Sequence, residues 1–208
     1  MGNKLKLPAT IRLAKEEELP KTPASIRERW HESQTANILE GYTIKFKGDN
    51  PDQADLGFAY YAEININNDR LWPLMKALSE SLPEVTAPLF GHIDSDLIYG
   101  RYHDKEEVID FLEICKIELA QDTFFEFGLL YHDEDNFAEI FVDQSKYIKY
   151  WGTDKPLFER IMKDFGLAEI EGLEFIDEYP KVREPLRLHL ENCIDTSEMV
   201  ELFREKFA

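Results

Sequence analysis

The sequence lacks the short motifs that mark most nucleotide-binding and hydrolytic proteins. It has no Walker loop, no G-x-G-x-x-G turn and no G-x-S-x-G elbow, and its 10 glycines stand singly. Neither of its 2 cysteines lies in a C-x-x-C pair or beside a histidine, which leaves thiol and redox catalysis without support. We therefore expect no catalytic residue, no bound cofactor and no enzymatic activity.

Long apolar runs are also missing. No stretch reaches the roughly 18 apolar residues that a membrane-spanning helix needs, and no apolar segment follows Lys4 and Lys6 as it would in a secretory signal. The cysteines, Cys115 and Cys193, are far apart. We interpret both as buried free thiols in helical segments, as in a reducing compartment. The expectation is a soluble cytoplasmic protein that does not bind membranes.

Positive charge is scarce. The 208 residues hold 24 Lys and Arg against 42 Asp and Glu, a net charge of −18. Residues 1–50 are slightly basic, with 9 against 7, whereas residues 51–208 hold 15 against 35. Such a surface repels nucleic acids and anionic lipids and attracts basic proteins. We expect a basic protein partner and no nucleic acid. The alternative is that the charge only keeps the protein soluble.

What the chain does have is enough apolar residues for a core. Hydrophobic residues make up 43% and aromatic residues 12%, which argues against disorder. Turn residues at 48–52 form a loop signal. It divides the chain into an N-terminal extension, residues 1–50, with an arm, a helix and a strand, and a main acidic domain, residues 51–208.

Residues 123–151 give the clearest local pattern. Alternating segments at 123–131, 137–142 and 146–151 are joined by short polar loops, which predicts an antiparallel three-stranded meander. Further strands are expected at 58–66, 85–90, 97–102 and 173–176. Helices are expected after residue 67, from Asp104, from Asp154 and at the C-terminus. The fold class is α+β: an antiparallel sheet with helices packed on one face, plus helical N- and C-terminal extensions.

Possible metal ligands do not have the spacing of a metal site. The run Asp133-Glu134-Asp135 begins like a calcium loop, but Ala138 stands where the turn glycine belongs and Gln144 where the bidentate glutamate belongs. Tetrahedral zinc spacing is missing too. We expect no metal site.

Two glutamates interrupt aromatic strands. Glu126 and Glu139 belong to neighbouring strands of the meander, where they can share one sheet face and raise each other's pKa. The alternative is that both face water or pair with Lys149.

The predicted binding site is the loop between the first two strands of the meander. Tyr131, Tyr147, Tyr150 and Trp151 are expected to cluster at the end of the meander that carries this loop, beside its three acids. Tyrosines there would supply rigid apolar area, and carboxylates would receive Lys or Arg. The predicted partner-binding residues are Tyr131, Asp133, Glu134, Asp135 and Tyr147.

The function predicted from these features is a non-catalytic acidic binding protein that captures a basic protein partner. Immunity proteins that neutralise nuclease toxins are also acidic proteins that capture a basic partner. This analogy rests on charge alone. One alternative is an enzyme or small-ligand binder with a pocket lined by His92, Asp94 and His132. Another is a homodimeric scaffold that buries its aromatic sheet face.

The charge predicts how stability depends on pH. Carboxylates in residues 51–208 repel one another at neutral pH, so acidification from pH 8 to pH 6 should raise the melting temperature. Carboxylates whose pKa is depressed in the folded state act oppositely, because their contribution is lost as pH falls through the folded pKa. Thermal unfolding at constant ionic strength measures the balance. A melting temperature that falls steadily from pH 8 to pH 6 would contradict the prediction.

Overall fold

A large antiparallel sheet organises the computed structural model, which describes residues 4–21, 23–48 and 57–208. The strand order is β2-β3-β9-β8-β7-β4-β5, and β6 also pairs with β4. All these pairings are antiparallel, which confirms the α+β class and the meander. The strands are β2 (Gly41–Phe46), β3 (Tyr60–Asn65), β4 (Val85–His92), β5 (Ile98–Tyr99), β6 (His103–Asp104), β7 (Phe125–His132), β8 (Phe137–Val142) and β9 (Ile148–Gly152).

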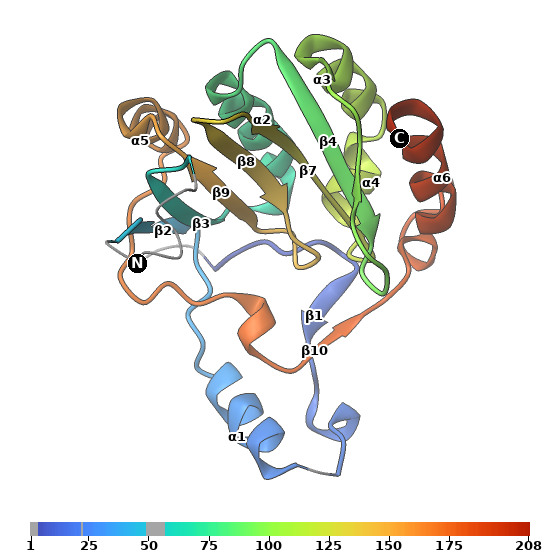
Figure 1. The fold of residues 1–208 in the computed structure, drawn as a ribbon. Helices are drawn as coiled ribbons and strands as arrows, with labels where there is room; N and C mark the ends of the chain where they lie inside the picture. The colour runs from blue at the N-terminus through green and yellow to red at the C-terminus, as the bar shows by residue number, and fades with distance from the viewer. Residues whose placement is uncertain (1–3, 22, 49–56) are drawn as a thin grey trace.

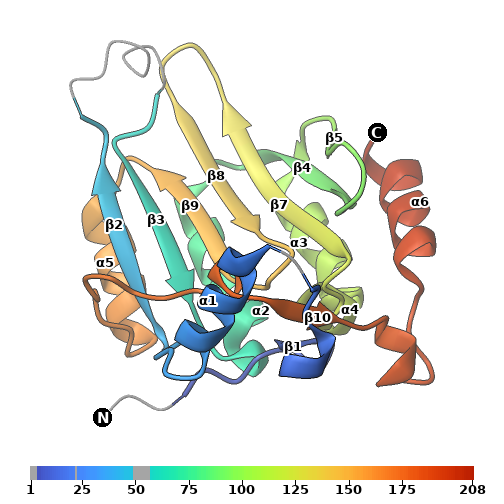
Figure 2. The same ribbon diagram turned by 90° about the horizontal axis from the view of Figure 1, so that it is seen from below.

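Helices cover one face of this sheet, as predicted. Figure 2 shows α2, α3, α4 and α5 behind the strands and α6 beside the β5 end. The buried face that they contact, called the helix face here, is made of apolar side chains that alternate along each strand. The helices are α2 (Asn68–Leu78), α3 (Lys105–Ile114), α4 (Lys116–Gln121), α5 (Lys155–Asp164) and α6 (Thr196–Phe207). The helix face includes Tyr60, Ala62, Ile64, Phe90, Phe127, Leu129, Ile140, Val142, Ile148 and Tyr150.

Local capping explains where the helices begin. Asp104 accepts hydrogen bonds from the backbone of Glu106 and Glu107 at the start of α3, and Asp154 accepts one from Leu157 at the start of α5. These three bonds satisfy amide groups that have no partner within the helix. The C-terminal helix docks on the sheet, where the Phe203 ring lies 5.3 Å from the Phe90 ring.

A smaller layer lies against the opposite face of the sheet, at one end. It contains β1 (Ile11–Leu13), the 3-10 turn η1 (Glu16–Glu18), α1 (Ala24–Ser33) and β10 (Lys181–Arg183), and β1 pairs with β10. Figure 1 shows this layer below the sheet, and Figure 2 shows it in front of one end. Its own core is built from Ile11, Ile38, Ile176 and Tyr179.

The boundary predicted near residue 50 stays a prediction, since residues 49–56 lie outside the described part of the chain. On its N-terminal side, β2 pairs along its whole length with β3 and is an edge strand of the main sheet.

Two local predictions are wrong. Residues 173–176 form no strand: Leu173 and Phe175 pack with Tyr147, and a 3-10 turn, η4 (Ile176–Glu178), follows. These residues are apolar because they are buried between layers, so their pattern imitates a strand. Cys193 lies outside any helix and is only half-buried.

Among the described residues, none of the helices combines the length and apolar character needed to cross a bilayer.

The thiols should differ in reactivity. Both cysteines are free, Cys115 is buried as predicted, and burial raises the Cys115 pKa to about 11. Because a thiolate is the reactive form, Cys115 should react with a disulfide reagent only as the protein unfolds, and Cys193 should react sooner. Labelling of the Cys193→Ser and Cys115→Ser variants under native conditions separates the two. Rapid native labelling of the Cys193→Ser variant would contradict a buried Cys115.

Candidate functional site

The predicted hairpin tip is a tightly bonded turn. Asp133 accepts hydrogen bonds from the backbone of Asp135 and Asn136, at 2.9 and 2.7 Å, and from the Tyr131 hydroxyl at 2.9 Å. These bonds, the one from Asp135 first, lower the Asp133 pKa to about 2. Glu134 and Asp135 are exposed. Asp133 therefore shapes the turn, and its two neighbours supply the free charge.

Tyr147 does not belong to this tip. It precedes β9 at the opposite end of the meander, where it is buried against Phe175, with its hydroxyl 3.2 Å from Asp177. The expected clustering of Tyr147 with Tyr131 is wrong, because β8 runs between the tip and the turn that carries Tyr147. The structure brings together Tyr131, Asp133, Glu134 and Asp135, and their binding role stays a prediction.

The tip has a neighbour that the sequence did not reveal. The Tyr102 hydroxyl bonds to both the backbone N–H and the carbonyl of His132, each at 2.9 Å, and its ring packs on Tyr131. Tyr102 is still 48% exposed. No local pattern could have predicted this contact, since 30 residues separate the bonded groups.

Glu126 and Glu139 share a sheet face but lie apart. In the β7–β8 register, Glu126 lies one residue beyond the Phe127–Val142 pair, level with Asp143. That position is four residues from Glu139, or about 13 Å at about 3.3 Å per residue. The Glu126 pKa is raised, mainly by burial and next by the Asp143 charge. Asp143 and burial, rather than Glu139, perturb Glu126.

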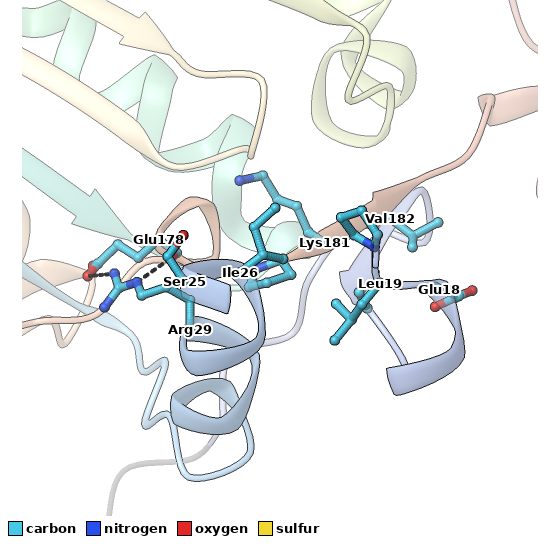
Figure 3. Close-up of a pocket in the computed structure, with 11 residues that line it drawn as sticks. Glu18, Leu19, Ser25, Ile26, Arg29, Glu178, Lys181 and Val182 are labelled. Atoms are coloured by element: carbon cyan, nitrogen blue, oxygen red, sulfur yellow. Dashed lines mark hydrogen bonds and ion pairs between the residues drawn. The ribbon is translucent and has the colours of Figure 1, made fainter. Parts of the chain in front are cut away.

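A hollow of about 390 Å³ lies between α1, η1 and β10 (Figure 3). Its charged groups already have partners. Glu18 bonds to Arg12 at 2.6 and 2.8 Å, Arg29 bonds to Glu32 at 2.7 Å, and Lys181 bonds to the Asp177 carbonyl at 2.9 Å. The hollow therefore offers apolar space without a charged group that needs a ligand.

Neither a metal site nor the alternative histidine pocket is assembled. In the described ranges, no group of three or more His, Cys, Asp or Glu side chains is arranged to hold a metal ion. His92 pairs with the first residue of β7, and His132 is its last residue. The predicted pocket of His92, Asp94 and His132 is wrong, because its histidines lie at opposite ends of one strand.

The sheet face opposite the helix face, called the open face here, carries one unsatisfied carboxylate. Glu139 lies in the middle of β8, half-buried, between Leu130 on β7 and Trp151 on β9. Within the described chain no group donates a hydrogen bond to it. Burial raises the Glu139 pKa to about 7, with the Lys149 charge acting in the opposite direction.

Lys149 does not neutralise Glu139, because it is held by another acid. Its ammonium lies 2.7 Å from the Asp143 carboxylate, and that carboxylate is only 5% exposed. Moving Lys149 to Glu139 would leave the buried Asp143 charge without its ion-pair partner, held only by the Ser145 N–H at 2.8 Å, which is unfavourable. Among the described residues, Glu139 thus has no cation bonded to it, although the Lys149 charge still acts on it.

Aromatic rings surround Glu139 on the open face. The Trp151 ring lies 4.7 Å from the Tyr61 ring, and the Phe137 ring lies 6.1 Å from the Phe58 ring. A hollow of about 340 Å³ adjoins them, lined by Lys45, Phe46, Lys47, Phe58, Tyr61 and Trp151. In Figure 2 none of the described helices lies in front of this half of the sheet. The combination of a carboxylate that no described residue pairs with and half-buried aromatic rings suits a cation from outside.

Comparisons with protein-family models, with curated proteins and with solved structures find no match for this chain.

The Glu139→Gln variant tests the state of this carboxylate. Its folded pKa, about 7, lies above the ordinary 4.5, so the folded state loses stability as pH rises from about 4.5 through about 7. Glutamine keeps the shape and removes the charge. We expect Glu139→Gln to be more stable than wild type by about 3 kcal/mol at pH 8, with the difference vanishing near pH 4.

Chemical denaturation at both pH values measures this difference. Glu134→Gln, at the exposed tip, is the matched control and should show no such pH dependence. A Glu139→Gln variant less stable than wild type at pH 8 would show that the carboxylate is already satisfied.

Proposed function

We propose that this chain is a non-catalytic binding protein that captures a basic protein partner on the open face of its sheet. The observation that carries the proposal is the half-buried Glu139 carboxylate, to which no group in the described part of the chain donates a hydrogen bond. Such a group destabilises the free protein, and a cation supplied by a partner would relieve that cost. Strongly perturbed groups of this kind concentrate at functional sites.

The charge of the whole chain supports the same partner class. A net charge of −18 attracts basic surfaces over distances near the Debye length, about 8 Å at physiological ionic strength. Glu134 and Asp135 project from the end of the open face and would speed encounter more than they hold the complex. The aromatic side chains near Glu139 would supply the apolar contact area.

An inhibitor or immunity-type role falls within this proposal. An acidic face that covers the nucleic-acid site of a nuclease would use the same charges. Two free cysteines are consistent with a reducing compartment such as the cytoplasm.

A basic probe tests the proposal before any partner is known. The probe is a short arginine–glycine peptide, and the same peptide with citrulline in place of arginine removes its charge and keeps its shape. Wild type should bind the arginine peptide more tightly, with an affinity that falls as salt rises. Glu139→Gln should weaken binding by about tenfold or more, because a bond between charged groups is worth about 1.5–3 kcal/mol.

The tip provides the matched comparison. Changing Glu134 and Asp135 to Gln and Asn, with Asp133 kept because it holds the turn, should slow association and flatten the salt dependence, with a smaller effect on dissociation. Calorimetry and stopped-flow fluorescence give these quantities. Equal affinity of wild type and Glu139→Gln for the arginine peptide would reject the proposal. A concentration-dependent dimer that buries Trp151 would favour the homodimeric scaffold instead.

A further inference from the structure

We propose that the cation received at Glu139 is the guanidinium of a partner arginine, which stacks on Trp151 and donates two parallel hydrogen bonds to the carboxylate. This inference rests on the function proposed above and narrows it from a basic partner to one that presents an arginine side chain. It combines three features of the open face: a free carboxylate, an indole directly beside it and an apolar surround.

The carboxylate is free to accept a bidentate donor. A carboxylate has two oxygens with about four acceptor positions, and within the described residues none of those positions on Glu139 receives a hydrogen bond. A guanidinium presents two N–H groups in a planar fork that matches this pair of oxygens. An ammonium is a point charge and satisfies the two oxygens less completely.

Trp151 is placed to receive the flat face of the same group. Glu139 and Trp151 are direct partners in the β8–β9 register, which puts their Cβ atoms about 4.5–5.5 Å apart on one face of the sheet. A cation in contact with the carboxylate therefore lies against the indole. Trp151 is only half-buried. On its other side, Tyr61 of β3 packs against it, with the two ring centres 4.7 Å apart.

The surroundings favour arginine over lysine. Glu139 is flanked along β8 by Phe137 and Phe141 and across the sheet by Leu130, so few polar groups could replace the water lost from a bound cation. An ammonium is strongly hydrated, whereas a guanidinium is weakly hydrated and stacks on aromatic rings. The arginine methylenes can lie along the aromatic hollow that adjoins Trp151.

Within residues 4–21, 23–48 and 57–208, no cation is hydrogen-bonded or ion-paired to Glu139. The nearest one on the face, Lys149, is held by Asp143 at 2.7 Å and lies 5.2 Å from the centre of the Tyr147 ring. Lys45 lies 3.9 Å from Glu63 on β3. The arginine position is therefore open to a side chain from a partner.

The test uses three peptides that differ at one residue. Gly-Ser-Arg-Ser-Gly, and the same peptide with lysine or with citrulline, are titrated into the protein while the Trp151 indole N–H and the Glu139 amide are followed by NMR. Wild type should bind the arginine peptide about fivefold or more tightly than the lysine peptide, which reflects about 1 kcal/mol of stacking. The citrulline peptide should bind weakest.

Variants separate stacking from charge. In Trp151→Leu the arginine and lysine peptides should bind equally well, and both should remain tighter than the citrulline peptide. In Glu139→Gln all three should bind alike. Trp151→Phe keeps an aromatic ring at this strand position, so it should retain part of the arginine preference. If Trp151→Leu disturbs the fold, Trp151→Phe replaces it in the test, because its spectrum should match that of wild type.

The outcomes distinguish the two proposals. Equal binding of the arginine and lysine peptides to wild type, with both lost in Glu139→Gln, would overturn the arginine assignment and leave capture of a basic partner in place. Binding of all peptides that does not depend on Glu139 would overturn both. An arginine preference that persists unchanged in Trp151→Leu would overturn the stacking geometry.

Discussion

A wide antiparallel sheet with apolar side chains on both faces gains stability wherever another layer shields them from water, and the rest of this structure depends on how far each layer extends. One face is covered by α2, α3, α4 and α5, with α6 at its edge. The second cover, made by β1, β10 and α1, extends over one end only. Aromatic residues such as Tyr61 and Trp151 lie on the part of this face that the second layer does not cover. Solvent therefore meets an apolar surface that soluble domains seldom leave exposed without use.

Charged groups differ between the covered and uncovered ends of this face. At the covered end, Asp143 is paired with Lys149 at 2.7 Å. In the turn before β9, the buried Lys146 ammonium donates to the Phe125 carbonyl at 2.7 Å and lies 5.6 Å from the centre of the Phe127 ring, which belongs to the helix face. Lys146 also has φ of 59°, an uncommon backbone conformation for a residue with a side chain. The sequence keeps these costly arrangements where each charge has a partner. At the uncovered end Glu139 has no such partner among the described residues, and this contrast is why we propose that a partner binds there.

The sequence predicted what local patterns determine. Alternation gave the meander, and capping residues gave the starts of α3 and α5, because these signals lie within a few residues of each other. It missed the pairing of Ile11–Leu13 with Lys181–Arg183, and it mistook Leu173 and Phe175 for strand residues. Contacts between segments so far apart in the sequence produce no periodic pattern of apolar residues in either segment. Glu139 was noticed as an interruption of an aromatic strand. Lys149 pairs with Asp143 and not with Glu139. Only the register of the three strands reveals this choice of partner.

The proposed binding role of the open face depends on the protonation state of one side chain, Glu139. A carbon-detected NMR titration of the Glu139 carboxyl group in the free protein measures its pKa directly. The structure predicts a value of about 7, with the carboxyl signal changing near neutral pH. A value at or below the ordinary 4.5 would mean that a hydrogen-bond donor or cation already stabilises the charge, and would contradict the claim that the open face awaits a cation.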